Sequence, residues 1–228
     1  MPAYRSAAEG EIREAVVARI RQQRPNARII HEINVSTYGP NRIDLIAVDR
    51  EEIIAVEIKS AKDKLTRLPA QIEAMRGCAH YAVVALHEKF LVEKTTNQWD
   101  AHYERDGVFY LKDLPDGVRR VNAWVYPEMR RATGPGTGYD SLASWRFPQV
   151  RLDAALPSGA LDLLWRDELY ALCGALRIAV PKRASMGPMI QQLRWLCTGR
   201  ELTRGICAML RARRCIEADP EIIEKVEA

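Results

Sequence analysis

Acidic residues interrupt two apolar runs in the first half of the chain. Asp44 lies within the run 43–48. Glu57 lies within the run 53–58, which ends directly before Lys59. Both runs are rich in β-branched residues, which favour strands, and a buried carboxylate costs free energy unless another group compensates its charge. A bound cation would provide that compensation.

The spacing of these residues predicts one shared site. Side chains alternate along a strand, so Glu57 and Lys59 lie on the same face, and the turn-forming residues 49–52 predict a hairpin that brings Asp44 close to Glu57. Two neighbouring carboxylates repel each other, whereas Mg²⁺ is typically held by one or two carboxylates, waters and a substrate phosphate. Lys59 would then hold or deprotonate an attacking water, or stabilise charge on the phosphate.

Asp44, twelve intervening residues and the tripeptide Glu57-Ile58-Lys59 resemble the active-site signature of the PD-(D/E)XK nuclease superfamily. These nucleases cleave phosphodiester bonds of nucleic acids with magnesium. The resemblance implies Asp44 and Glu57 as Mg²⁺ ligands, the Ile58 carbonyl as a third ligand, and Lys59 as the catalytic lysine; Mn²⁺ would be able to replace Mg²⁺. Residue 43 is isoleucine where the name of the signature has proline.

The same resemblance implies two further site residues. Many members carry a glutamate on the first helix, and Glu9 matches it because it projects near the apolar stripe, with Glu11 as the alternative. Glu9 would complete the carboxylate set directly or through water. Gln71 matches a glutamine on the next helix and would orient water or phosphate, although the tyrosine that often follows is Met75 here. Basic side chains after the strand would contact nucleic-acid phosphates: Lys62, Lys64 and Arg67.

Periodicity predicts helices over 6–24 and 65–77, strands over 28–35, 42–48, 53–59 and 81–87, a short helix over 88–95 and a strand over 107–111. The regular part of the second helix should begin near Leu68, because Pro69 is tolerated in a first helical turn. The resulting αβββαβ order resembles a restriction-endonuclease-like core with a mixed central sheet. We expect this core over 1–114.

A second, all-α domain is expected over 151–228, after an extension and a Gly/Pro-rich linker over 115–150 that is richest in turn formers at 130–144. The spacing predicts helices near 161–172, 189–197 and 202–213 that cap the core through Trp165, Leu193 and Trp195. The string 164–168, Leu-Trp-Arg-Asp-Glu, is similar to the opening of the helical tail in small bacterial and phage-type superfamily members.

Charge is concentrated in this helical tail. The whole chain has a net charge of +4, but residues 159–215 contain ten basic and four acidic side chains. Such an excess favours contact with phosphates, and a solvated helix surface gives the same pattern. The sequence does not separate these two interpretations.

Composition excludes several classes of protein. No apolar run approaches the roughly 20 residues of a membrane helix, and the start of the chain lacks the apolar region of a signal peptide, so we expect a cytoplasmic protein with no membrane partner. The five cysteines form no CxxC pair, and neither they nor the four histidines have the spacing of zinc ligands.

The sequence therefore predicts a Mg²⁺-dependent deoxyribonuclease, an endonuclease, with DNA as its partner. Two alternatives stay open: a catalytically silent nucleic-acid-binding module, and a protein-interaction subunit of a repair or phage-related assembly that docks through the helical tail. A third, simpler interpretation is that Glu57 and Lys59 lie on an edge strand, where charges only discourage aggregation. The sequence leaves open whether the chain forms a homodimer, and which form of nucleic acid it takes.

Overall fold

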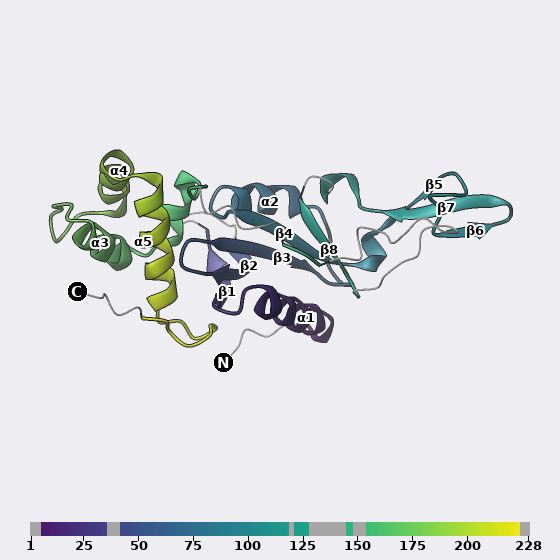
Figure 1. Ribbon diagram of the computed structural model, residues 1–228, viewed down its shortest axis with the longest axis horizontal. Helices are drawn as coiled ribbons and strands as arrows, with labels where there is room; N and C mark the ends of the chain where they lie inside the picture. Colours follow the sequence, from purple (N-terminus) through teal and green to yellow (C-terminus); the bar gives the residue numbers. More distant parts are fainter. Residues whose placement is uncertain (1–5, 36–41, 119–120, 128–144, 148–153, 224–228) are drawn as a thin grey trace.

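The computed structural model describes residues 6–35, 42–118, 121–127, 145–147 and 154–223. It is an α/β structure with a mixed central sheet and a group of helices toward the C-terminal end of the chain (Figure 1). The predicted linker at 130–144 lies outside the described residues. Within those residues, no helix combines the length and the apolar character needed to cross a membrane.

The predicted order of the first six elements is confirmed. They are α1 (Ala7–Gln23), β1 (Arg28–Asn34), β2 (Arg42–Val48), β3 (Ile53–Lys59), α2 (Leu68–Arg76) and β4 (Tyr81–His87). The central sheet has the order β1-β2-β3-β4-β8, with β8 at Asn122–Tyr126. β1, β2 and β3 are antiparallel neighbours, whereas β3, β4 and β8 are parallel. β3 is therefore a central strand, and the edge-strand interpretation of its charges is wrong.

Helices α1 and α2 cover opposite faces of the sheet (Figure 1). Ser6 caps the start of α1 by accepting a hydrogen bond from the Glu9 backbone N–H at 3.3 Å, and the helix ends before Pro25. The apolar stripe of α1 packs in one hydrophobic cluster with alternate residues of β3, among them Ile54, Val56 and Ile58. The intervening positions of β3, which include Glu57 and Lys59, face α2, as strand alternation predicts.

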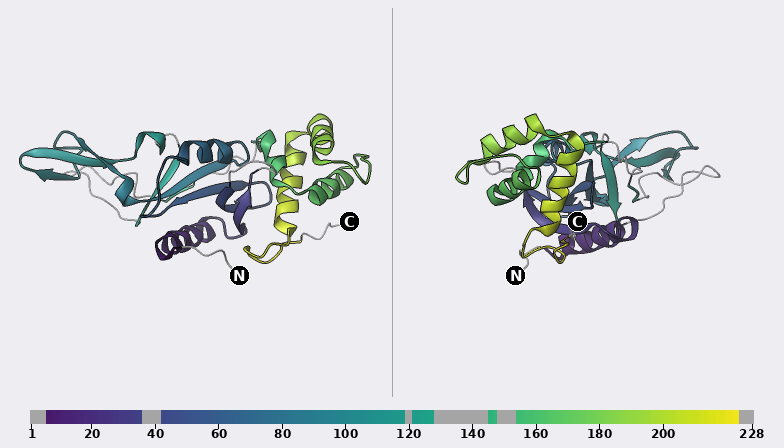
Figure 2. Two further views of the ribbon diagram at one scale, coloured as in Figure 1. Left: turned by 180° about the vertical axis from the view of Figure 1, so that it is seen from behind. Right: turned by 60° about the vertical axis from the view of Figure 1, so that its left-hand side comes forward.

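A second, three-stranded sheet extends from one end of the molecule (Figures 1 and 2). It has the order β5-β7-β6, formed by Val92–Thr95, Val108–Asp113 and Tyr103–Arg105. The helix predicted over 88–95 is thus wrong, because only a 3-10 turn forms at Glu88–Phe90 and the following residues pair with β7. Four residues are too few for local periodicity to distinguish a strand from a helical turn.

Strand β8 was not predicted. It pairs in parallel with β4, and its Trp124 and Val125 are buried. Its residues fall within the predicted extension 115–150, so the central sheet continues beyond the expected boundary at 114. Without the β4 edge as partner, the five residues of β8 have too little periodicity to be recognised.

The helices that follow are η4 (Ser158–Leu163), α3 (Arg166–Ala175), α4 (Met186–Leu196) and α5 (Gly199–Ala212). Leu172, Leu193 and Leu210 belong to the same hydrophobic cluster as the α2 face of the sheet, so these helices pack directly on the core. The expected packing through Leu193 is confirmed. That through Trp165 and Trp195 is wrong, because both indoles are exposed.

The Leu-Trp-Arg-Asp-Glu string has a structural role at the start of α3. Glu168 accepts a hydrogen bond from the Trp165 backbone N–H at 2.7 Å and from Arg213 Nε at 2.6 Å. The Arg213 guanidinium also lies 4.4 Å from the Trp165 ring centroid and donates to the Leu163 carbonyl at 2.7 Å. These contacts join the start of α3 to the end of α5.

Replacing Arg213 with alanine is expected to lower the free energy of unfolding by about 3 kcal/mol, because it leaves Glu168 largely buried without its counter-charge. Urea denaturation at neutral pH measures this loss. The adjacent Arg214 is 90% exposed, so Arg214→Ala should change stability by less than about 0.5 kcal/mol. Equal effects of the two substitutions would contradict the assigned role of the Arg213–Glu168 pair.

Candidate active site

Strands β2 and β3 separate at the predicted site. Their backbone pairing ends at Leu45 and Val56, so the next position on each strand would place Asp44 opposite Glu57. Instead, Asp44 Oδ2 accepts a hydrogen bond from the Ile58 backbone N–H at 2.7 Å. The carboxylate thereby satisfies an amide in the place where the two strands no longer pair.

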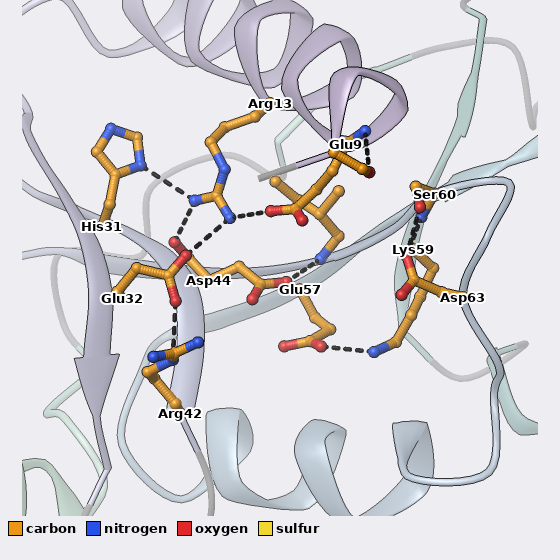
Figure 3. Close-up of polar contacts among 12 residues, drawn as sticks. Glu9, Arg13, His31, Glu32, Arg42, Asp44, Glu57, Lys59, Ser60 and Asp63 are labelled. Carbon is orange, nitrogen blue, oxygen red and sulfur yellow. Dashed lines mark hydrogen bonds and ion pairs between the residues drawn. The ribbon is translucent and has the colours of Figure 1, made fainter. Parts of the chain in front are cut away.

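A cleft of about 670 Å³ opens at this separation. Seven predicted site residues line it: Glu9, Asp44, Glu57, Ile58, Lys59, Arg67 and Gln71. Figure 3 shows the side chains of Glu9, Asp44 and Glu57 directed toward the same space, with Lys59 beside Glu57. Glu11, the alternative to Glu9, is exposed and does not line the cleft, and neither do the exposed Lys62 and Lys64 of the loop after β3.

Glu57 is held by two donors and retains one unused oxygen. Lys59 Nζ lies 2.7 Å from Glu57 Oε1, and the Gln71 side-chain amide donates to the same oxygen. Glu57 is only 2% exposed, and its Oε2 is buried with no hydrogen-bond partner among the described residues. An unsatisfied buried carboxylate oxygen is costly, so the cleft contains an acceptor that can bind a cation or a water.

The two carboxyl groups lack sufficient positive charge around them. Burial and the neighbouring Asp44 carboxylate raise the pKa of Glu57 to about 7, against the opposing effect of Lys59. Burial also raises the pKa of Asp44 above its ordinary value, although the hydrogen bond from Ile58 and the charge of Arg13 act in the other direction. A divalent cation between the carboxylates would stabilise their ionised forms.

The residues present fit a hard divalent cation. Two carboxylates and a backbone carbonyl are oxygen donors of the kind that Mg²⁺ prefers, and Mg²⁺ commonly keeps several waters. The described part of the chain has no cluster of three or more His, Cys, Asp or Glu side chains able to hold a metal ion. The oxygen donors that line the cleft and could hold such an ion are the Asp44 and Glu57 carboxylates and the Ile58 carbonyl, and Glu9 could contribute through water.

Arg13, which was not predicted, links the first helix to this site. It is buried, its Nη2 lies 2.7 Å from Glu9 Oε1 and 3.0 Å from Glu32 Oε1, and its Nη1 donates to the Asp44 carbonyl at 2.5 Å (Figure 3). Nη1 also lies 3.2 Å from His31 Nδ1. The guanidinium therefore holds Glu9 and the backbone of β2 in fixed positions beside the cleft.

Glu32 completes this network from an unusual backbone conformation. Its φ is +57°, in the left-handed region that non-glycine residues rarely adopt. The side chain pairs with Arg13 and, at 2.8 Å, with Arg42, which lines the cleft. Such conformations cost free energy and occur often at functional sites. The sequence held one signal for this network, the i,i+4 spacing of Glu9 and Arg13.

The loop after β3 is fixed by its own hydrogen bonds. Asp63 Oδ2 accepts from the Ser60 backbone N–H at 2.7 Å and from Ser60 Oγ at 2.6 Å. Lys89, at the base of the second sheet, donates to the Ala61 carbonyl. Helix α2 then begins at Leu68, as predicted, and places Gln71 over Glu57.

Stability without metal should depend on pH through Glu57. The pKa of about 7 in the folded state exceeds the ordinary value of 4.5, so the folded protein holds a proton that the unfolded chain has lost between these values. The free energy of unfolding in EDTA should therefore fall as pH rises from about 4.5 to 7, by about 3 kcal/mol from this group. Glu57→Gln should remove this component.

Urea denaturation of the wild type and of Glu57→Gln at pH 5 and pH 7.5 measures the difference. Glu73→Gln is a matched control, because Glu73 lies on α2 with its side chain 71% exposed. Identical pH dependence in the wild type and Glu57→Gln would show that burial does not shift the pKa of Glu57 upward.

The fold and site together define an α/β protein whose mixed sheet carries the half-buried Asp44 carboxylate, the buried Glu57 carboxylate and a lysine in one cleft. Residues 3–98 match the family model described as bacteriophage P4 protein cII. This segment is less than half of the 228-residue chain, and it includes the cleft residues named above. Neither a curated protein nor a solved structure matches the chain.

Proposed function

We propose that this chain is a Mg²⁺-dependent nuclease with a restriction-endonuclease-like core, which hydrolyses phosphodiester bonds of DNA as an endonuclease. The observation that carries the proposal is the meeting of Asp44, Glu57 and Lys59 in one cleft where β2 and β3 separate. The order of α1, three antiparallel strands, α2 and a parallel β4 supports it, since the PD-(D/E)XK resemblance implies this order.

Each cleft residue has a role in this proposal. Asp44, Glu57 and the Ile58 carbonyl hold Mg²⁺ or Mn²⁺. Bound there, the ion supplies a water of lowered pKa and stabilises negative charge on the phosphate. Lys59, whose Nζ lies 2.7 Å from Glu57, orients the attacking water or stabilises charge on the phosphate. The Gln71 Oε1 atom is buried without a hydrogen-bond partner among the described residues and can accept from a water.

Basic residues around the cleft suit a DNA backbone. Arg42 and Arg67 line it and are exposed, while Lys62 and Lys64 are exposed on the adjoining loop. Their positive charge favours phosphate contact, which fixes the position of the nucleic acid without reading its bases. We therefore expect these four residues to contribute little sequence preference to cleavage.

A cleavage assay tests the proposal. The purified 228-residue chain is incubated with single-stranded, duplex and branched DNA in Mg²⁺, Mn²⁺ or EDTA. Cleavage of at least one form with either metal, absent in EDTA, is the expected result. Binding of DNA without cleavage of any form would contradict the proposal and favour a catalytically silent nucleic-acid-binding module.

A further inference from the structure

Helix α4 carries an apolar surface that the fold does not bury. Trp195 is 86% exposed and the adjacent Leu196 is 59% exposed, whereas Met189 and Leu193 of the same helix are fully buried. Tryptophan has a large apolar side chain that is on average well buried in folded proteins. The stability of α4 therefore depends on its other face, and the exposed indole is available for a partner.

The chain around this indole is uniformly basic. Residues 177–200 contain five basic side chains and no acidic one. All five are exposed: Arg177, Lys182, Arg183, Arg194 and Arg200. Arg194 and Arg200 have only distant carboxylates, at 3.9 Å on Asp162 and 3.8 Å on Glu51. This segment therefore combines one exposed aromatic ring with five exposed basic side chains, and only two of these, Arg194 and Arg200, have a carboxylate partner in the described part of the chain.

We propose that the α4 surface, formed by residues 177–200 and including Trp195, binds single-stranded nucleic acid. Unpaired bases have flat faces that stack on an indole whatever their sequence, and basic side chains attract the connecting phosphates. Double-stranded DNA keeps its bases stacked on one another, so it does not offer this contact. The choice of DNA as the anionic polymer rests on the proposed nuclease function.

The position of α4 makes this surface a holding site. The turn between β2 and β3 contacts α5 through the ion pair of Glu51 and Arg204, whereas the cleft lies at the other end of β3, where Lys59 is. Figure 1 shows α4 next to α5, at the end of the molecule opposite the β5-β7-β6 sheet. A nucleic-acid strand bound on α4 would thus be held away from the reacting phosphate. The α4 surface would therefore affect the affinity for nucleic acid.

The chain also contains a matched control. Trp99 is 61% exposed on the segment between β5 and β6, so it is a second large exposed indole. Its surroundings differ in charge, because residues 88–118 contain seven acidic and four basic side chains. If exposed aromatic area alone attracted nucleic acid, replacing either tryptophan would weaken binding. If charge and stacking act together, only the replacement of Trp195 would weaken it.

Fluorescence anisotropy with a labelled oligothymidylate tests the inference on the 228-residue chain in EDTA, where metal-dependent cutting does not occur. Trp195→Ala should weaken binding about five- to hundredfold, and Trp195→Phe should weaken it less, because phenylalanine still stacks. The Lys182→Ala, Arg183→Ala double variant should reduce the dependence of log K on log salt by about 1.4. Trp99→Ala should bind like the wild type.

Three results would overturn the inference: no binding of the oligonucleotide by the wild type, equal binding by Trp195→Ala, or binding of phosphatidylserine vesicles in its place. Because the assay needs no catalysis, its outcome is separate from that of the proposed function. Trp195-dependent binding by a protein that cuts no DNA would retain this surface and reject the nuclease. Cleavage of DNA by the wild type, with no effect of Trp195→Ala on oligonucleotide binding, would retain the nuclease and reject this surface.

Discussion

Replacing Lys59 with alanine is expected to lower the rate of Mg²⁺-dependent DNA cleavage by about 10²- to 10⁴-fold, the usual contribution of a positioned proton-transfer group. Lys59 is buried beside Glu57 at 2.7 Å and lines the cleft, so its ammonium group can act only on what enters there. Single-turnover cleavage rates at saturating protein measure the loss. DNA affinity should change little, because exposed basic residues around the cleft supply the phosphate contacts.

Lys94→Ala is the matched control for this substitution. Lys94 forms an ion pair of similar length, 2.9 Å from Asp113, but this pair is partly exposed and lies in the second sheet. This variant should cut at the wild-type rate. If Lys59→Ala also cuts at that rate, the catalytic role of Lys59 is refuted, and the buried Lys59–Glu57 pair has only a structural role.

Asp44→Asn should lower cleavage by about 10³-fold or more and abolish measurable Mg²⁺ binding, because it removes one of two carboxylates from the ion. The fold should persist, since the asparagine oxygen can still accept the hydrogen bond from the Ile58 N–H. Removing the repulsion between Asp44 and Glu57 should also make the metal-free protein more stable near pH 7. Calorimetry measures the loss of Mg²⁺ binding, and urea denaturation measures the gain in stability.

A gain of stability together with a loss of metal binding distinguishes a functional carboxylate from a structural one. Asp49→Asn, at the other end of β2, changes the same charge outside the cleft and should leave metal affinity unaltered. Undiminished Mg²⁺ affinity in Asp44→Asn would count against Asp44 as a ligand.

The central part of the fold follows from short-range patterns in the sequence. β2 and β3 were predicted with their observed bounds, because two apolar, β-branched runs on either side of a four-residue turn indicate a hairpin. Alternation also placed Glu57 and Lys59 on one face. Since register and alternation fix which side chains share a face, the approach of Asp44 to Glu57 was predictable before any coordinates.

Other features depend on contacts that no local pattern contains. β8 forms only by pairing with the edge of β4. The left-handed backbone conformation of Glu32 depends on contacts such as its ion pair with Arg13, which no local pattern predicts. The exposure of Trp195 could not be predicted either, since an apolar residue at a helical position is normally assigned to the core. Tertiary packing decides which face of a short helix is buried.

We propose that the gap between β2 and β3 binds a divalent cation for phosphodiester hydrolysis. Crystals of the wild-type protein soaked in Mn²⁺, with the metal located by its anomalous scattering, would show whether the ion binds there. The predicted result is a single strong peak about 2.0–2.3 Å from the carboxylate oxygens of Asp44 and Glu57. An empty gap at saturating Mn²⁺, or a peak only elsewhere on the protein, would contradict it.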